Sequence, residues 1–411
     1  MVAGAAGHPG GCSGVTPAIP AAAAGPARPL PATTAPLSDT TLDELAATIA
    51  GGATVAGLGE STRFAHETFT VRDQLFRRLA RQHRFRALVL QDHAAVAVRL
   101  DKYVTTGEGT ARSALDGAFR PWRTAEMAAA LEWIREFNQD NPHDPIRILA
   151  VKPAQPQPAD YDAILDHARQ SAPQRLAELA SHLEPIRTAH QTDEHVQRAR
   201  GTHPGRPFAD HARDALTIAE TISGPGGGAL VERMRLIVHY HENSVAGKGS
   251  HAGDAHAWAG TISAYQRRAR TRVAYWDGIA HTTASQPVLG LEPEHGPRPT
   301  TGSVLRQHYG QRYVSVAIGF HHGDLGIAVA PDPAPDLIDA RLAQSGQPSR
   351  WLDLRSHDMG RLWDGPAKAR VISGIYDPSR DSAEYMAVAS LTDAFDVLVH
   401  LHEITPTRWL P

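Results

Sequence analysis

The stretch Ala53–Phe69, ATVAGLGESTRFAHETF, combines a short apolar run, a polar turn and the beginning of an amphipathic segment. The run Ala53–Leu58 is short and mostly apolar, which predicts a strand inside a sheet. Apolar residues then recur at helical spacing as far as Leu79, which predicts a helix over Glu67–Gln82. A buried strand that passes through a polar turn into a helix is the building unit of α/β folds.

The same alternation continues on both sides of this stretch. Ser38 is a favourable cap for a short helix that ends near Ile49. Further strand-like runs lie at Ala87–Leu90, Ile146–Val151, Arg272–Trp276, Tyr313–Ile318, Val371–Ile375 and Val397–Leu401. Strands that alternate with helices predict an α/β fold with a largely parallel central sheet flanked by helices.

Between about 160 and 270 the strand signal lapses and helical periodicity takes over. The helical segments are Tyr161–Gln170, Gln174–Arg187, Ala209–Ile222, Leu230–His241 and His256–Arg270. We therefore predict a helical lobe at about 160–270, inserted into a domain that spans residues 38–411.

Residues 1–37 are rich in Ala, Pro, Gly and Thr and contain no aromatic residue. Such a segment buries too little apolar surface to offset its ordering entropy, so we predict that it is disordered. It has neither the early basic residues nor the unbroken apolar run of a signal peptide, and no apolar run in the chain approaches the roughly 18 residues of a membrane helix. The single cysteine, Cys12, excludes an internal disulfide. These features favour a cytoplasmic protein that does not bind membranes.

The composition also limits the class of partner. The 411 residues include 41 Lys and Arg against 44 Asp and Glu, a net charge of −3, without the basic excess of a nucleic-acid binder. We expect a small-molecule or biosynthetic-intermediate substrate and no nucleic-acid partner. Only four of the 41 basic residues are lysine, and with the many Ala, Gly and Pro residues this suggests a GC-rich gene. The 23 histidines are therefore judged by position rather than by number.

Polar residues follow five predicted strands at their carboxyl ends, where open parallel sheets bind ligands. The clusters are Gly59–Arg63, Gln91–His93, Lys152, Trp276–His281 and Phe320–Asp324. The candidate substrate-binding residues are Gln91, Asp92, His93, Trp276, Asp277 and His321.

The first cluster supplies the first candidate catalytic residues, Glu60, Arg63, His66 and Arg72. Arg63 and His66 are three residues apart, a spacing that places them on neighbouring faces of one helical turn. An arginine at a helix N-terminus could orient a substrate carboxylate or stabilise a developing oxyanion. Arg72 could reach back to Glu60 or Gln91. The alternative is a set of solvated surface pairs of little energetic worth.

His281 is the fifth candidate catalytic residue. Its unperturbed pKa suits proton transfer near neutrality, and it follows a Trp-Asp-Gly strand end. Asp277 could hold a histidine tautomer, as the acid of a catalytic triad does. The alternative is a loop histidine with satisfied hydrogen bonds.

Motifs for metal or cofactor chemistry are missing from the sequence. We find no HExxH helix, no CxxC pair, no GxSxG elbow, no Walker loop and no GxGxxG. Asp92, His93, His281, His321 and His322 are suitable ligand types, but no recognisable spacing joins them. We expect no metal and no cofactor.

The stretch Gly57–Phe69, followed by Arg72, resembles the opening motif of the erythromycin esterase family, which typically reads G-x-G-E-x-T-H-G-x-x-E-F before an arginine. Further short matches keep their order along the chain: Leu88–Asp92, Arg99–Val104, Glu242–Asn243, Val273–His281, Gly302–Arg306, Phe395–Val399 and Thr405–Thr407. The resemblance implies an erythromycin esterase-like fold and hydrolysis without a metal, in which the histidine of G-E-x-T-H activates water.

Three positions depart from the family pattern. Arg63 replaces that histidine, Gln91 replaces a glutamate, and Gly278 replaces the first histidine of W-A-H-N-x-H, whereas Glu60, Arg72 and His281 are retained. Arginine cannot deprotonate in a protein, so it cannot serve as the base.

Two hypotheses follow. The first is a metal-independent acid–base enzyme with an altered site, which acts on a small bacterial secondary metabolite by ester or amide hydrolysis or by non-hydrolytic elimination or ring closure. Such a protein would belong to secondary metabolism, for example to antibiotic biosynthesis. The second is a catalytically inactive member that binds an anionic or polyhydroxylated ligand.

Overall fold

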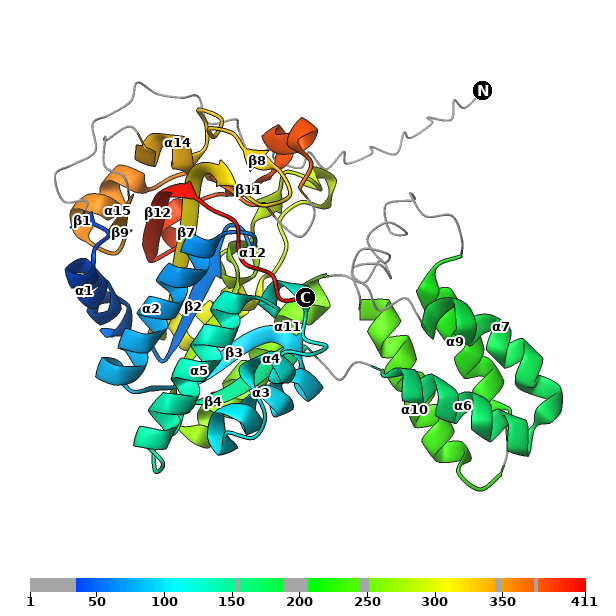
Figure 1. The fold of residues 1–411 in the computed structure, drawn as a ribbon. Helices are drawn as coiled ribbons and strands as arrows, with labels where there is room; N and C mark the ends of the chain where they lie inside the picture. Colours follow the sequence, from blue (N-terminus) through cyan, green and yellow to red (C-terminus); the bar gives the residue numbers. More distant parts are fainter. Residues whose placement is uncertain are drawn as a thin grey trace, which may run out of the picture.

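The computed structural model describes residues 35–152, 156–187, 206–222, 224–243, 251–343, 349–372 and 376–411. Within these ranges the chain forms a nine-stranded sheet (Figure 1). Its order is β1 (Ala35–Pro36), β9 (Ser349–Asp353), β12 (Val397–Ile404), β7 (Tyr313–Asp324), β2 (Val55–Glu60), β5 (Arg272–Gly278), β3 (Phe85–His93) and β4 (Arg147–Lys152), with β8 (Val329–Ala330) paired to β7.

The strands from β12 to β4 are all parallel to their neighbours. The short edge strands β1 and β9 and the strand β8 pair antiparallel. All six residues of the central strand β2 are buried, because β7 and β5 flank it and helices cover both faces. The predicted α/β class with a largely parallel central sheet is confirmed.

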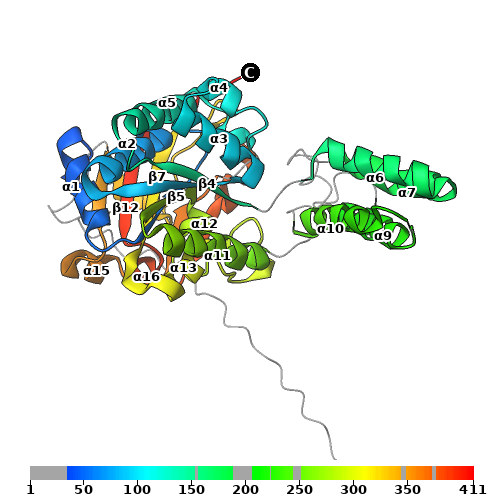
Figure 2. The same cartoon turned by 90° about the horizontal axis from the view of Figure 1, so that it is seen from below.

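Helices pack on the two faces of the sheet (Figure 2). One face carries α1 (Asp39–Ala50), α2 (His66–His83), α3 (Ala94–Thr106), α4 (Ala111–Ala114) and α5 (Ala125–Asp140). The other carries α11 (His251–Ala269), α12 (Ile279–Thr282), α13 (Thr301–Tyr309), α14 (Ile338–Ala343), α15 (His357–Trp363) and α16 (Leu391–Ala394). Short 3₁₀ turns lie at η1 (Arg120–Trp122), η2 (Pro173–Arg175), η4 (Pro293–His295), η5 (Gly310–Arg312) and η6 (Pro378–Ala383).

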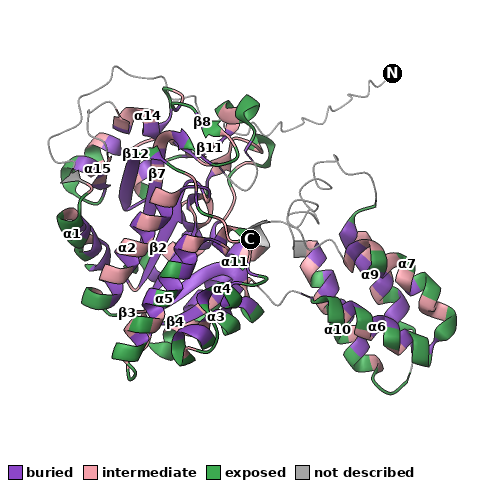
Figure 3. Ribbon diagram, viewed as in Figure 1, coloured by how far each residue is buried: buried purple, intermediate pink, exposed green. Residues whose placement is uncertain are grey.

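Local sequence signals account for the first elements. Ser38 caps α1 and forms a capping box with Thr41, which satisfies backbone donors at the helix start. In α2 the residues at helical spacing, Phe69, Leu75, Phe76 and Leu79, are all buried. Figure 3 shows the same pattern across the sheet, whose strands are buried along most of their length.

A second, three-stranded antiparallel sheet contains β10 (Ala367–Arg370), β11 (Tyr385–Val388) and β6 (Val288–Leu289). In its described part the strand predicted at Val371–Ile375 is not found: the pairing of β10 ends at Arg370, and Ile372 makes only an isolated bridge with Thr62. The strand β10 has the alternating sequence Ala-Lys-Ala-Arg, and such alternation is typical of an antiparallel strand with one solvated face. Residues 373–375 lie outside the described residues.

A helical lobe stands beside the α/β body (Figure 1). Its described helices are α6 (Pro158–Ser171), α7 (Leu176–Arg187), α9 (Phe208–Glu220) and α10 (Gly227–Asn243), and they share a separate apolar core that includes Tyr161, Leu183, Phe208 and Met234. The predicted lobe extended to residue 270, but α11 packs against the sheet through Trp258 and Ile262. The helices of the lobe thus end with α10.

The end of the predicted disordered segment is structured. Residues 1–34 of the predicted disordered segment lie outside the described residues. Ala35–Pro36, predicted to be disordered, instead form β1 and pair with Arg350 and Trp351 at the sheet edge. Among the helices of the described ranges, none has both the length and the apolar character needed to cross a bilayer.

Candidate active site

The carboxyl ends of the central strands bring together the charged side chains of the candidate site. Glu60 ends β2 and lies beside Gly278 of β5 in the strand register. Because side chains alternate between the faces of a strand, Glu60 faces α2, whereas Asp277 faces α11 and α12. Arg63, in the turn after β2, bridges the two faces across the edge of the sheet.

Glu60 forms the half of the site that faces α2. Its carboxylate pairs with the fully buried Arg72, and Arg63 Nε lies 3.5 Å from its Oε1. The Arg72 guanidinium also lies over the rings of Trp276 and Trp122, 4.7 and 5.2 Å from their centroids. Burial raises the pKa of Glu60, and the two guanidinium groups oppose this shift. These contacts fix Glu60 and Arg72 as a rigid, desolvated pair.

Asp277 forms the other half. Its Oδ1 accepts hydrogen bonds from Arg63 Nη2 at 2.6 Å and from the backbone N–H of Gly278 at 2.7 Å. Its Oδ2 accepts one from the Tyr275 hydroxyl. The carboxylate is fully buried, so these donors replace its hydration shell. Arg63 is thereby held between two acids, with only 13% of its side chain exposed.

His281 lies at the same edge, on α12. Its ring contacts Trp258 of α11, with 5.4 Å between the ring centroids. Burial lowers the pKa of His281, and the charges of Arg63 and Lys152 lower it further, while Asp277 opposes them. The imidazole is therefore neutral near pH 7 and can accept a proton.

Lys152 and Asp254 complete the site. Neither of them was among the candidate site residues of the sequence analysis. Lys152 ends β4, lies 4.2 Å from the centroid of the Phe119 ring, and has a pKa lowered by burial. Asp254, in the first turn of α11, has a pKa raised by burial to about 6. The position of Lys152 after a strand was a usable signal. Asp254 gave none, because only tertiary packing brings α11 to this edge.

Three predicted site residues do not lie as the sequence analysis expected: His66, Trp276 and, as described below, His321. The His66 ring is 2.8 Å from Glu126 of α5 and 3.3 Å from the Thr70 hydroxyl, on the side of α2 away from Arg72. The spacing argument failed because α2 begins at His66, so that Arg63 lies before the helix. Trp276 is completely buried against α2 and supports Arg72 from below, so it is not an exposed substrate wall.

The last residues of β3, Gln91–His93, hold the neighbouring loop in place. Asp92 accepts hydrogen bonds from the backbone N–H groups of His93 and Phe119 at 2.7 and 2.9 Å, which fixes the loop that presents Phe119 to Arg63. Gln91 is buried, and its backbone carbonyl accepts a bond from Trp122. His93 is half-buried at the rim and its ring lies 6.1 Å from that of Tyr240 in the lobe.

His321 is on the extended end of β7 and belongs to a different cluster. Its Nδ1 is 2.8 Å from that of His322 and 3.5 Å from Asp332. The charged groups that act on it are Asp332, His322, His402 and Arg370, none of which acts on Glu60.

Gly278 lies next to the Arg63 guanidinium. A Cβ atom at position 278 would lie 3.7 Å from Arg63 Nη2. This distance is ordinary van der Waals contact, so a side chain at position 278 would pack directly beside the guanidinium that pairs with Asp277.

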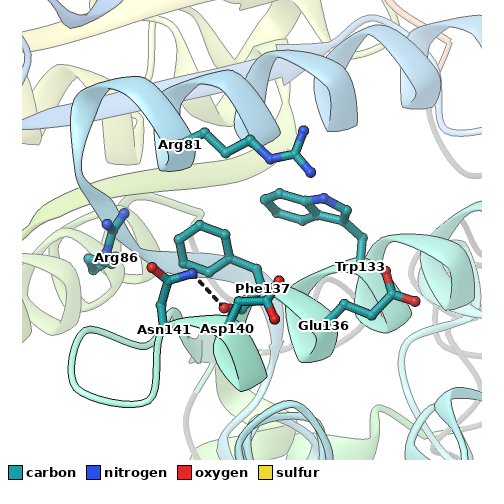
Figure 4. Close-up of a pocket in the computed structure, with 7 residues that line it drawn as sticks. All are labelled: Arg81, Arg86, Trp133, Glu136, Phe137, Asp140 and Asn141. Atoms are coloured by element: carbon teal, nitrogen blue, oxygen red, sulfur yellow. Dashed lines mark hydrogen bonds between the residues drawn. The ribbon is translucent and has the colours of Figure 1, made fainter.

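A cavity of about 360 Å³ lies at the opposite end of the molecule from this site (Figure 4). It is lined by Arg81 of α2, Arg86 near the start of β3, and the last turns of α5, including Trp133 and Phe137. Helices run opposite to parallel strands, so this cavity is at the amino end of the sheet. It does not include any of the predicted site residues.

Comparisons with known proteins agree with this architecture. A solved structure of a protein from Bacillus cereus is 18% identical, with a TM-score of 0.61 over 92% of this chain and 97% of that chain. A succinoglycan biosynthesis protein is 16% identical, with a TM-score of 0.62 over 91% and 95% of the two chains. A mutant of the erythromycin esterase EreC, solved in its open conformation, is 14% identical, with a TM-score of 0.56 over 88% and 94%.

These likenesses concern the fold, and no curated protein sequence matches the chain. The erythromycin esterase family model matches residues 80–404, so Gln91, Gly278 and His281 lie inside the match, and Glu60 and Arg63 lie before it. Because this match covers well over half of the sequence, the chain belongs to the erythromycin esterase family.

Proposed function

We propose that this protein is a metal-independent acid–base enzyme of the cytoplasm that acts on a small bacterial secondary metabolite. His281 is its general base and Arg63 its electrophilic clamp. The substrate carries an ester, amide or carboxyl group, whose oxygen the guanidinium can bind in two-pronged fashion.

The observation that carries this proposal is the position of Arg63. Its guanidinium is fixed by Asp277 at 2.6 Å and by Glu60, at the point where the family resemblance implies a water-activating histidine. A fixed cation at this point stabilises negative charge that develops on a substrate oxygen, and it needs no reorganisation during the reaction. It cannot remove a proton from water.

The proton acceptor must then be another group. His281 meets the requirement, because its lowered pKa leaves it neutral near pH 7. Lys152 and Asp254 supply a cation and a carboxyl group whose pKa is about 6, which suits it to proton donation in mildly acidic conditions. This set supports hydrolysis with His281 as base, and equally a ring closure or elimination that needs no activated water.

The second candidate function is ligand binding without turnover. It is favoured by the ion pairs of the two central carboxylates: Glu60 pairs with Arg72, and Asp277 pairs with Arg63. Carboxylates that are already paired in this way are not free to act as bases. Such a site would hold an anionic or polyhydroxylated ligand through Arg63 and Lys152.

A turnover experiment distinguishes the two. The full-length protein is incubated in H₂¹⁸O, with and without EDTA, with erythromycin and a panel of lactones and carboxylate esters, and the products are analysed by mass spectrometry. We expect turnover that EDTA does not abolish and that His281→Gln eliminates. The control is His308→Gln, an exposed histidine on α13 of the same face.

The isotope then assigns the reaction type. Incorporation of ¹⁸O indicates hydrolysis, and its absence in a product indicates ring closure or elimination. Saturable binding without turnover, with His281→Gln changing affinity only, would overturn the enzymatic proposal in favour of the binding protein. Activity that is lost in EDTA and restored by Zn²⁺ would overturn metal independence.

A further inference from the structure

Four histidines gather at the carboxyl ends of the neighbouring strands β7 and β12. In the parallel register Leu401 lies opposite Phe320 and Glu403 opposite His322, which places His402 beside His321. The rings of His321 and His402 are stacked, 5.5 Å apart at their centroids, and the ring of His400 is 6.4 Å from that of His321. The ring of His402 also lies 5.3 Å from that of His322.

Three side chains of this region present ligand atoms to a common point. The Nδ1 atoms of His321 and His322 are 2.8 Å apart, and Asp332 Oδ1 lies 3.5 and 3.7 Å from them. Tetrahedral Zn²⁺ with bonds of about 2.0–2.2 Å separates its ligand atoms by about 3.3–3.6 Å. The distance from Asp332 to His321, 3.5 Å, falls in this range, and the distance to His322, 3.7 Å, exceeds it by about 0.1 Å. The two imidazoles need to separate by about 0.5 Å to bind one ion.

A buried arginine fixes the backbone that carries these ligands. Arg370 Nη1 donates hydrogen bonds to the carbonyls of His321 and Pro331, at 2.5 and 2.8 Å. Its Nη2 is held by both oxygens of Asp381 at 3.1 Å. The end of β7 and the loop after β8 are thus tied together directly beside His321 and Asp332, as outer-shell contacts orient the ligands of a metal site.

The charge and accessibility of the cluster also suit a cation. Asp332 supplies the negative charge and is 79% exposed, so the ion has an open path from solvent.

We propose that His321, His322 and Asp332 bind one Zn²⁺-like divalent ion, with water completing its coordination, at a site separate from the one that contains Arg63. Two imidazoles and a carboxylate are ligand types that zinc commonly takes. The sequence analysis predicted no metal because no standard motif or spacing joined the candidate ligands, and Asp332 was not among those candidates. The β7–β8 hairpin brings these residues together.

The ion would cross-link β7 to the loop after β8, so we expect a structural effect and not a catalytic one. In the register of β2 and β7, Glu60 lies opposite Ile318, and His321 lies three residues further along the strand. No charged group is shared between the interactions of Glu60 and those of His321. This proposal therefore stands whether or not the proposed enzymatic function does.

The test uses untagged, full-length protein that has been stripped with EDTA. We expect isothermal titration to show one tight equivalent of Zn²⁺ per chain, Co²⁺ to give the intense visible absorption of a tetrahedral site, and Zn²⁺ to raise the melting temperature. His322→Gln and Asp332→Asn should each weaken binding about tenfold or more and remove the thermal shift. Both side chains are partly or largely exposed, so these substitutions leave the fold intact.

The matched control is His295→Ala, an exposed histidine 3.2 Å from Glu292 that lacks a second imidazole partner in the described contacts. It should leave the tight equivalent unchanged. The proposal is overturned if the stripped protein takes up no tight Zn²⁺, or if His322→Gln and Asp332→Asn bind Zn²⁺ as tightly as the parent protein. Unchanged catalytic turnover on Zn²⁺ binding is the expected result; turnover that requires the ion would overturn the separation of the two sites.

Discussion

Arg63 takes its position from two acids on opposite faces of the sheet, and this arrangement sets its predicted effect on turnover. The pairs with Glu60 and Asp277 orient its planar fork in advance, so that no reorganisation is needed when charge develops on a substrate. We expect Arg63→Ala to lower kcat on the order of 10²–10³, the typical cost of one oxyanion donor. Arg63→Lys should be nearly as poor, because an ammonium lacks the two-pronged geometry.

Steady-state kinetics check this prediction, with Arg120→Ala, a surface arginine near the same edge, as the control. Wild-type kcat/KM in Arg63→Ala would show that the residue has no part in turnover. Arg63→His alone should not produce macrolactone hydrolysis, since Gln91 and Gly278 also depart from the family pattern. A gain of that activity in the single variant would contradict the coupling between positions 63 and 278.

The neutral state of His281 predicts a pH dependence. A general base works when deprotonated, and the pKa of His281 lies below its ordinary 6.5, so kcat/KM should hold as pH falls through 6.5 and decline only in more acidic solution. Lys152 contributes to lowering that pKa. Lys152→Met should therefore move the acid limb of the profile to higher pH, whereas Lys102→Met, in an exposed pair with Glu108, should not move it. An acid limb that stays in place in Lys152→Met argues against His281 as the titrating base.

At this scale the sequence allowed part of the site to be predicted. Glu60, Arg63, Asp277 and His281 come together because strand ends in a parallel sheet share one edge, a rule that needs only the strand positions. His66 and Trp276 were misplaced because their directions depend on where α2 begins and on which face of β5 is turned to it. Asp254 needed the packing of α11 against β4, which no local pattern encodes.

Among the elements, α12 depends on the glycines of β2 for its approach to the sheet. A Cβ atom at Gly59 would clash with the Thr282 hydroxyl and lie 2.9 Å from the Cα of Ile279. α12 must therefore move if Gly59 acquires a side chain, and His281 moves with it. We expect Gly59→Ala to destabilise the fold by about 1–3 kcal/mol and to lower kcat on the order of 10².

Thermal unfolding and kinetics on the same preparation test this prediction. Gly52→Ala is the control, since a Cβ there meets nothing closer than the Gln311 carbonyl at 3.8 Å. Full activity in Gly59→Ala would show that α12 tolerates the displacement without loss of alignment.

The boundaries of helices and strands were predicted most accurately where the local sequence signal was strong. The capped helix α1 and most strands of the parallel core were predicted to within three residues at each end, because continuous apolar runs are typical of buried strands. The exception is β7, which extends six residues beyond the predicted end at Ile318. The run at Val371–Ile375 was predicted as a strand because it is apolar, but the neighbouring strand β10 ends before it, at Arg370. Apolar periodicity predicted a helix over His256–Arg270, which the structure shows as α11 (His251–Ala269), but it could not show that this helix covers the main sheet and not the lobe.

For the molecule as a whole, the lobe contacts the rim of the site through the end of α10. Tyr240 lies beside the His93 ring, and the charge of His239 acts on Asp254. The lobe has its own apolar core, so these contacts at the end of α10 join two separately packed parts of the chain.

This arrangement predicts that Tyr240→Ala affects substrate capture more than chemistry. Loss of one aromatic contact is worth roughly 0.5–1.5 kcal/mol, so KM should rise roughly twofold to tenfold while kcat and the melting temperature stay nearly unchanged. Arg235→Ala, on the same helix and in an exposed pair with Glu232, should change none of the three. A fall in kcat at constant KM would contradict this prediction, because it would mean that Tyr240 aligns the reacting groups themselves. A fall in melting temperature would show that the contact with His93 holds the lobe to the body and does not govern access to the site.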